Sequence, residues 1–509
     1  MSDQKLVNLT IEGRQVSVPE GTTILEAAKT AGVLIPHYCY HPGLKIAGVC
    51  RMCLVEVEKF PKLAPSCATT VAEGQVVSVY SQKALDARKG VLELLLINHP
   101  LDCPICDQAG ECELQDYTFQ EGRADSRYKE PKRFNPAEDF GGDVLYVTNR
   151  CILCTRCVRF MGDVAGDRAL CVEERGDRAH IGISPDRDLS SPWAANVVDL
   201  CPVGALVSKD FLNKARAWEL DRTASVCPNC SQGCNITLES RDENVVRMKP
   251  RANDAVNHFY MCDEGRLNYQ WINREDRLET PMVGGRPATW DAAIAAAGSA
   301  LKSGGAHVVA HGSLSNEALF LLKQAAGTGK FRVAQGAEAP LPGVKDLSVR
   351  ADRTPNATGA EMLGFTRADQ PLAGAKGVVV IAGDDLEGLD TAALASAATV
   401  IVLGTVAPKG LPANAILLPI ANFAEEEGTF TNLRGRVQRY LQARPAKGAA
   451  RPAWMVLSEL AAAAGKKGGY ASAEAVFASL AAAEAPFNGM SYDSIGLKGQ
   501  LAAGAGVTA

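Results

Sequence analysis

The last 247 residues of this sequence contain no cysteine, since all 16 cysteines of the 509-residue chain lie between Cys39 and Cys262. Cysteine-bound metal and disulfides are therefore excluded after Cys262. Phosphate-binding and hydrolytic motifs are also missing: no GxGxxG follows a predicted strand, and neither a Walker A sequence nor HExxH occurs. These absences indicate a chain without catalytic residues, flavin or nicotinamide of its own.

Long apolar segments, basic excess and a targeting sequence are likewise missing. The longest uncharged run is Thr391–Pro408, in which we expect a helix over Ala393–Ala398 and a buried strand over Thr399–Leu403 rather than a membrane span. A net charge of −5 argues against a nucleic-acid partner. The N-terminus has no apolar signal core and no amphipathic presequence, so we expect reduced thiols that bind metal.

The N-terminal segment has the pattern of a ferredoxin. Apolar and polar residues alternate around Gly13, and Thr22 or Thr23 can cap a helix. The predicted elements are a hairpin, a helix and two strands, at residues 6–18, Ile24–Ala31, Leu54–Glu58 and Val76–Tyr80. This order is typical of a β-grasp fold.

The rest of the chain changes pattern several times, and its length predicts several domains. Residues 83–122 have a helical period, and the charged, proline-containing residues 123–141 suggest a linker. Beyond about residue 280, alanine-rich helical stretches separate short buried strands, which is an α/β pattern. These strands are predicted at His307–Ala310, Val378–Ala382, Val400–Leu403 and Ile416–Leu418.

Four groups of residues have the spacing of metal ligands. The first is Cys39, Cys50, Cys53 and Cys67, spaced C-x10-C-x2-C-x13-C. Glycines and prolines keep this loop irregular, so that backbone N–H groups can point at cluster sulfurs. We expect a [2Fe–2S] cluster here, with a structural zinc ion as the alternative.

The second group needs a histidine, because three cysteines cannot complete a four-ligand set. Its members are His99, Cys103, Cys106 and Cys112. A neutral imidazole in place of a thiolate removes one negative charge and is expected to raise the potential of a [4Fe–4S] cluster. The alternative is that His99 caps a helix and another group binds the iron.

The third and fourth groups both predict [4Fe–4S] clusters. The third is Cys151, Cys154, Cys157 and Cys201, in which Cys201 precedes Pro202 as in two-cluster ferredoxins. The fourth is Cys227, Cys230, Cys234 and Cys262.

A few residues near these groups have no assigned role. Cys171 fits no group, and we expect a buried free thiol. Four arginines lie beside ligands and either offset cluster charge or are solvated at the surface: Arg51, Arg150, Arg156 and Arg159.

These ligand sets, in this order, resemble those of the large iron–sulfur subunit of respiratory complex I, the G subunit of bacterial NADH–quinone oxidoreductase. The resemblance covers roughly residues 1–280. It implies one [2Fe–2S] and three [4Fe–4S] clusters, the fourth of a kind found in only some bacterial members, off the main electron path. The implied fold is multidomain α+β and α/β. Its domains are a [2Fe–2S] ferredoxin-type domain (1–82), a one-histidine, three-cysteine [4Fe–4S] domain (83–122), a bacterial-ferredoxin-like [4Fe–4S] domain (142–212), a [4Fe–4S] domain of the molybdenum/tungsten type (222–278) and a truncated molybdopterin-oxidoreductase-like α/β domain (279–509).

The last of these domains departs from its relatives. Phe423–Asn432, followed by Gly435–Gln438, resembles a molybdopterin-oxidoreductase motif. No cysteine follows Cys262 to bind molybdenum, however, and Glu264 stands where catalytic relatives have a lysine. We therefore expect no molybdopterin and a structural remnant that packs against partners.

The resemblance implies an electron-transfer subunit of NADH:quinone oxidoreductase, coupled in the whole complex to proton translocation. The implied partners are the flavoprotein that binds FMN and NADH, its small [2Fe–2S] companion, the quinone-side iron–sulfur subunits and, indirectly, the membrane arm. The implied location is peripheral, on the cytoplasmic side of a bacterial inner membrane. The alternative is the iron–sulfur subunit of a soluble NAD-linked hydrogenase or formate dehydrogenase.

Overall fold

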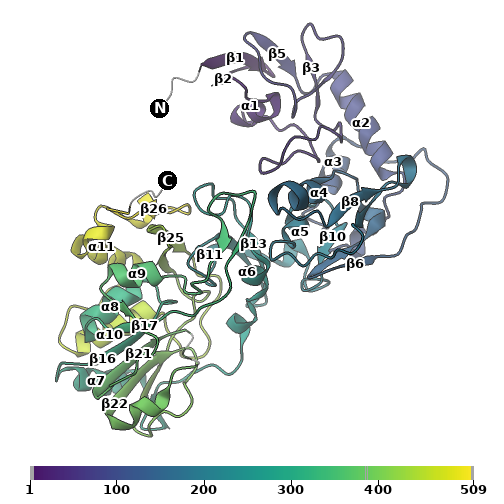
Figure 1. Cartoon of the computed structure of the whole chain (residues 1–509). Helices are drawn as coiled ribbons and strands as arrows, with labels where there is room; N and C mark the ends of the chain where they lie inside the picture. The colour runs from purple at the N-terminus through teal and green to yellow at the C-terminus, as the bar shows by residue number, and fades with distance from the viewer. Residues whose placement is uncertain (1–4, 385, 387, 506–509) are drawn as a thin grey trace. The chain divides into compact units, whose positions relative to one another are not determined.

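The computed structural model describes residues 5–384, 386 and 388–505. The chain forms two compact units of mixed helices and strands (Figure 1). The N-terminal unit contains residues 1–219 and 341–345, and the C-terminal unit contains residues 220–340 and 346–509. The first three ligand sets therefore belong to one compact unit, and the fourth belongs to the other.

The N-terminal unit begins with a five-stranded sheet in the order β2-β1-β5-β3-β4. Its strands are β1 (Leu6–Ile11), β2 (Arg14–Pro19), β3 (Leu54–Val57), β4 (Ala64–Pro65) and β5 (Gln75–Ser78). The predicted hairpin is confirmed, with Gly13 at φ +74° in its turn. Helix α1 (Ile24–Thr30) is also confirmed, and the Thr23 side chain caps it. The apolar faces of α1 and the strands form one core.

Two helices, α2 (Gln82–Leu96) and α3 (Glu113–Glu121), flank the loop of the second ligand set. Arg88 on α2 is fully buried and forms an ion pair with Glu121 on α3. The same guanidinium donates to the carbonyl oxygen of Val79 at 2.9 Å. These contacts connect both helices to the end of the first sheet. They therefore fix both ends of the loop that carries the second ligand set.

The rest of this unit is built from short elements. They are β6 (Glu138–Gly141), β7 (Val144–Tyr146), α4 (Arg156–Arg159), β8 (Leu170–Glu173), β9 (His180–Ile183), α5 (Asn196–Leu200) and β10 (Leu206–Ser208). The expectation of a linker over 123–141 is wrong at its end, because β6 pairs with β7. Strand β10 pairs with β7 from the other side, which brings Cys201, close before β10, back to the first three cysteines of its set.

The C-terminal unit contains a three-stranded antiparallel sheet and an eight-stranded sheet. The small sheet consists of β11 (Asp221–Val226), β12 (Asn235–Arg241) and β13 (Asn244–Pro250), with α6 (Asp263–Leu267) nearby in sequence. The large sheet has a parallel centre, and its strands in spatial order are β15 (Arg286–Pro287), β14 (Met282–Val283), β23 (Ile416–Pro419), β22 (Ala397–Gly404), β21 (Gly377–Gly383), β16 (His307–His311), β17 (Lys330–Arg332) and β20 (Thr366–Arg367). The four predicted strands of this region are therefore confirmed.

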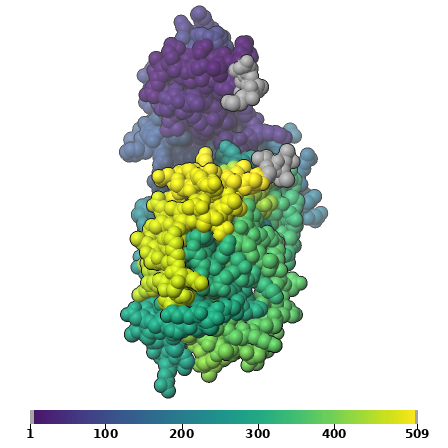
Figure 2. All heavy atoms as spheres, turned by 90° about the vertical axis from the view of Figure 1, so that its left-hand side faces the viewer, coloured from purple at the N-terminus to yellow at the C-terminus, as the bar shows by residue number. Residues whose placement is uncertain are grey.

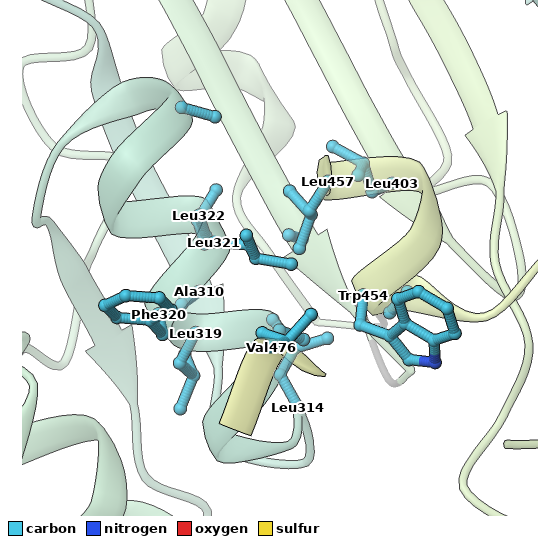
Figure 3. Close-up of a cluster of buried hydrophobic side chains, with 14 of the residues drawn as sticks. Ala310, Leu314, Leu319, Phe320, Leu321, Leu322, Leu403, Trp454, Leu457 and Val476 are labelled. Atoms are coloured by element: carbon cyan, nitrogen blue, oxygen red, sulfur yellow. The ribbon is translucent and has the colours of Figure 1, made fainter. Parts of the chain in front are cut away.

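Helices cover the large sheet because parallel strands are apolar on both faces. The helices of this unit after α6 are α7 (Trp290–Leu301), α8 (Asn316–Ala326), α9 (Ala357–Met362), α10 (Ala453–Ala463), α11 (Ala473–Ala483) and α12 (Tyr492–Ile495). Leu321 of α8, Leu403 of β22 and Leu457 of α10 are fully buried in one cluster (Figure 3). Residues near the C-terminus, yellow in Figure 2, form one side of this unit's surface. A further small sheet is made of β24 (Gly428–Thr431), β25 (Arg436–Tyr440) and β26 (Gln500–Leu501).

The uncharged run is partly as predicted. A 3₁₀ helix covers Thr391–Ser396, and β22 begins at Ala397, so the expected helix over Ala393–Ala398 ends two residues early. Strand pairing with β21 takes over those two residues. Across the described part of the chain, no helix combines the length and hydropathy needed to cross a bilayer.

A buried carboxyl group joins three elements of the C-terminal unit. Glu317 on α8 is fully buried, and its oxygens accept hydrogen bonds from the backbone N–H and the hydroxyl of Thr429 on β24 and from the hydroxyl of Tyr492 on α12. Burial raises the pKa of Glu317 from 4.5 to about 7, although these donors oppose the rise. The folded protein therefore keeps this proton at pH values where the unfolded chain has lost it.

This proton predicts a pH-dependent stability. Between pH 4.5 and about 7 the folded state binds more protons at Glu317 than the unfolded state does, so the free energy of unfolding falls by roughly 3 kcal/mol as the pH rises. Glu317→Gln has no such proton, and we expect its unfolding midpoint in guanidinium to fall less between pH 5 and 7.5. Glu459→Gln, at a partly exposed site, is the control. Equal pH slopes for Glu317→Gln and the wild type would contradict the prediction.

Candidate metal centres

The four cysteines of the first set lie together next to the first sheet. Cys39, Cys50 and Cys53 are in the loop between α1 and β3, and Cys67 lies two residues after the end of β4. Cys39, Cys53 and Cys67 are at most 1 % exposed. The backbone N–H of Cys39 donates to the sulfur of Cys50 at 3.5 Å. Backbone donors of this kind stabilise anionic sulfur.

The thiols of the first set also interact with one another. Hydrogen bonds with the Cys50 and Cys67 thiols lower the pKa of Cys39 well below its usual range. A hydrogen bond with Cys67 lowers the pKa of Cys53 to about 7. These interactions require the four sulfurs of the first set to lie close together, as ligands of one metal centre would.

The four residues of the second set lie in the loop between α2 and α3. Cys103 is exposed, whereas Cys106 and Cys112 are buried. His99 has a buried Nδ1 atom for which the described residues provide no hydrogen-bond partner. Burial lowers the pKa of His99 to about 4, so its imidazole is neutral near pH 7. A neutral imidazole with an unsatisfied buried nitrogen suits a metal ligand, whereas a helix cap would require a hydrogen bond.

The third set lines one small enclosed cavity, with all four of its cysteines in the wall. Leu153 and Thr155 take left-handed backbone conformations at φ +52° and +59°, which turn the short loop around its centre. The N–H of Leu153 donates to the sulfur of Cys151 at 3.3 Å. Burial raises the pKa of Cys151 to about 11 and that of Cys154 to about 12. Thiolates in such a site require a bound cation, so the donor set fits a metal centre.

The fourth set lies in the C-terminal unit. Cys227 follows β11, Cys234 precedes β12, and Cys262 caps α6, its sulfur accepting from the N–H of Gly265 at 3.2 Å. A side chain at Gly265 would lie 3.2 Å from the sulfurs of both Cys227 and Cys262, so these two sulfurs approach the same backbone position. Burial raises the pKa of Cys227 to about 12. As in the third set, uncompensated thiolates here need a cation.

In the described ranges, no three Cys, His, Asp or Glu side chains meet the geometry of a site for one metal ion.

The arginines beside the ligands differ in exposure. Arg150 and Arg156 are buried, at 9 % and 4 % exposure, so the hypothesis of solvated surface arginines is wrong for these two. Arg159 is half-buried and Arg51 is exposed. Neighbouring residues in the sequence gave no means of separating the four, because their burial depends on loops that pack from elsewhere in the chain.

The structure also places Cys171 and Glu264, two residues that the sequence had singled out. Cys171 on β8 is half-buried rather than buried, and its thiol donates to the carbonyl oxygen of Gly182 at 3.7 Å across the β8–β9 pair. Glu264, in place of the lysine of catalytic relatives, forms an ion pair with Arg353 at 2.8 Å.

Protein-family profiles match five segments of the chain. Residues 4–82 match a 2Fe-2S iron-sulfur cluster binding domain, and residues 88–127 match the NADH-ubiquinone oxidoreductase-G iron-sulfur binding region. Residues 141–207 match the ferredoxin-like domain of NADH-quinone oxidoreductase subunit 3. Residues 220–274 match the molybdopterin oxidoreductase Fe4S4 domain, and residues 351–463 match molybdopterin oxidoreductase.

Similar proteins agree with these profiles. The G subunit of NADH-quinone oxidoreductase from Rickettsia bellii is 42 % identical over 340 residues, which is 65 % of this chain and 50 % of that protein. The mitochondrial NADH-ubiquinone oxidoreductase 78 kDa subunit of Candida albicans is 46 % identical over 294 residues, covering 57 % and 41 %. The chain thus spans about half the length of the curated relatives it matches. A solved NAD⁺-reducing [NiFe]-hydrogenase is 31 % identical with a TM-score of 0.38, over 41 % of this chain and 90 % of the hydrogenase chain.

The fold and the cysteine-rich sites define an iron–sulfur protein with [2Fe–2S] and [4Fe–4S] binding domains. Within that class, the chain is similar to the large iron–sulfur subunit of NADH–quinone oxidoreductase, complex I, over the segments that these proteins and profiles match.

Proposed function

We propose that this chain is the electron-transfer subunit of an NADH:quinone oxidoreductase that couples electron flow to proton translocation. The observation that carries the proposal is that one compact unit contains three different ligand sets, each within a segment that matches an iron–sulfur domain. Electrons enter from a flavoprotein that oxidises NADH, with its small [2Fe–2S] companion, and leave to quinone-side iron–sulfur subunits. The complex is held at the cytoplasmic side of a bacterial inner membrane through its membrane arm.

Bound iron–sulfur clusters would supply one-electron chemistry at these sites. The residues that hold them are, by cluster, Cys39, Cys50, Cys53 and Cys67 for [2Fe–2S], and for the [4Fe–4S] clusters His99, Cys103, Cys106 and Cys112, then Cys151, Cys154, Cys157 and Cys201, then Cys227, Cys230, Cys234 and Cys262. The protein contributes ligands, backbone donors to sulfur and exclusion of water, since most of these side chains are buried.

The finer architecture forms part of the same proposal. Its five domains are the β-grasp domain over 1–82, three [4Fe–4S] domains over 83–122, 142–212 and 222–278, and the truncated molybdopterin-oxidoreductase-like domain over 279–509. The ion pair of Glu264 with Arg353 supports a domain that has lost its molybdenum chemistry, because a relay lysine would remove that pair.

Low-temperature EPR of the anaerobically purified, dithionite-reduced protein tests the proposal. We expect one [2Fe–2S] signal and three [4Fe–4S] signals, with iron and labile sulfide in matching amounts. Colourless protein that carries zinc would contradict the proposal, and so would the absence of the [2Fe–2S] signal. Co-purification with a flavoprotein and membrane subunits tests the assignment to complex I rather than to a soluble enzyme.

A further inference from the structure

Three arginines beside ligands of the third set extend from their own loop to the loop of another set. Arg150 precedes Cys151, Arg156 precedes Cys157, and Arg159 follows two residues later. Each guanidinium donates hydrogen bonds to the loop of another ligand set, far away in the sequence. The acceptor is a ligand, a residue next to a ligand, or another residue of the same loop. The arginines differ in which sets they join.

Arg156 joins all three sets of the N-terminal unit. Its Nη2 donates to the carbonyl oxygen of Tyr40 at 2.8 Å, next to the ligand Cys39 of the first set. Its Nη1 donates to the carbonyl oxygen of Leu200 at 3.3 Å, next to Cys201 of its own set. The same guanidinium is 3.4 Å from the carboxylate of Glu113, which follows Cys112 of the second set. At 4 % exposure, this charge is largely shielded from water.

Arg159 joins the first and third sets. Its Nη2 donates to the carbonyl oxygen of Cys39 at 2.5 Å and to that of Cys154 at 3.2 Å, so it touches the backbone of a ligand in each set. Its Nη1 donates to the carbonyl oxygen of Lys45 at 2.6 Å, farther along the first loop.

Arg150 joins the second and third sets. Its Nε and Nη2 donate to one carboxylate oxygen of Asp102 at 3.0 and 2.9 Å, next to the ligand Cys103. Its Nη1 lies 3.5 Å from the carbonyl oxygen of Gly204, three residues after Cys201.

A fixed positive charge near a cluster favours its reduced state, because reduction adds an electron to an already anionic centre. Arginine suits this role, since a guanidinium does not lose its proton in a protein and holds several carbonyl oxygens at fixed angles. Asp102 and Glu113 offset part of the charge of Arg150 and Arg156. Both carboxylates are more exposed than their partners, at 32 % and 38 %, so solvent weakens this offset.

We propose that Arg150, Arg156 and Arg159 form an electrostatic network that raises the reduction potentials of the three clusters of the N-terminal unit, each arginine acting on the sets it joins. The inference rests on the proposed function, since it requires clusters at these ligands. In this role the arginines are positioning and tuning residues, which also hold the three loops at fixed separations.

Potentiometric titration of each cluster, followed by EPR on the purified holoprotein, tests the network. Arg159→Gln is expected to lower the potentials at the first and third sets and leave the His99 set unchanged. Arg150→Gln is expected to lower the potentials at the second and third sets and leave the [2Fe–2S] centre unchanged. Arg156→Gln is expected to lower all three. Each affected cluster should show at least a roughly tenfold change in its reduced-to-oxidised ratio at fixed potential, about 59 mV for a one-electron couple.

Two matched variants separate charge from structure. Arg51→Gln, next to Cys50 but exposed, is expected to leave all potentials unchanged. Arg156→Lys keeps the positive charge but loses the planar guanidinium with its several donors. We expect the reduction potentials of its three clusters to stay closer to the wild-type values than in Arg156→Gln. Intact clusters with unchanged potentials in the Gln variants, or shifts without the set-specific pattern, would overturn the network. If Arg156→Gln does not fold, the patterns of Arg150→Gln and Arg159→Gln decide. Absence of cluster signals in the wild type would instead overturn the proposed function.

Discussion

Cys157→Ala is expected to remove one four-iron centre and to stop electron flow through the chain. Cys157 is 7 % exposed and lines the enclosed cavity of the third set with Cys151, Cys154 and Cys201. Without one of its four thiolates this site cannot close around a cubane, and burial raises the pKa of the three remaining thiols, which favours their protonated form. We expect iron analysis to fall by about four atoms per chain. Under the proposed function, NADH:quinone activity of the assembled complex should fall to that of a preparation without this subunit.

Cys171→Ala is the matched control. Cys171 is a half-buried thiol of the same unit that belongs to no ligand set. We expect it to keep the full iron content, all EPR signals and wild-type activity. Unchanged iron in Cys157→Ala, or iron loss in Cys171→Ala, would show that the third ligand set is assigned wrongly.

Glu425→Ala is expected to cost roughly 3–5 kcal/mol of folding free energy. Glu425 is fully buried in the C-terminal unit between Arg277 and Arg444. Arg277 donates to both of its carboxylate oxygens at 2.9 and 2.8 Å, and Nη2 of Arg444 donates at 2.7 Å. Burial alone would raise the pKa of Glu425, but these hydrogen bonds and charges hold it below its usual range. Removal of the carboxylate leaves two buried guanidinium groups without a counter-charge.

Guanidinium-induced unfolding of the full chain measures this cost. Glu459→Ala is the control, because Glu459 pairs with Arg451 at 3.0 Å where both side chains are about one-third exposed. An exposed pair of this kind contributes about 0–1 kcal/mol. Equal midpoint shifts for the two variants would contradict a stabilising role for the Glu425 network. A larger midpoint shift for Glu425→Ala than for Glu459→Ala would show that Glu425, within the Phe423–Asn432 segment, stabilises the fold.

Local features of the sequence predicted much of this fold. Alternation on either side of Gly13 predicted the β1–β2 hairpin, and Thr22 and Thr23 before an apolar stretch predicted a capped helix, for which the structure selects Thr23. Both signals lie within a few residues of the structure they determine. The end of the predicted linker was missed because β6 is held by pairing with β7 rather than by its own composition.

The ligand sets were also predicted from sequence, because clustered thiolates have few other uses in a reduced protein. Spacing alone grouped the cysteines, and the structure adds geometry that supports the grouping: the shared cavity of the third set and the unsatisfied Nδ1 of His99. The iron assignment itself stays a prediction until the spectra are measured.

The sequence by itself determined which side chains are available as ligands and in which order, since those ligands are largely carried on short local loops. Only the tertiary structure decided which charges act on them. Arg156 and Tyr40 are separated by 116 residues, and Arg277 and Glu425 by 148. An arginine beside a cysteine has the same sequence signal whether water or another loop surrounds it. Burial strengthens the electrostatic interactions of a charge because it removes the screening by water. It arises only when distant segments pack together.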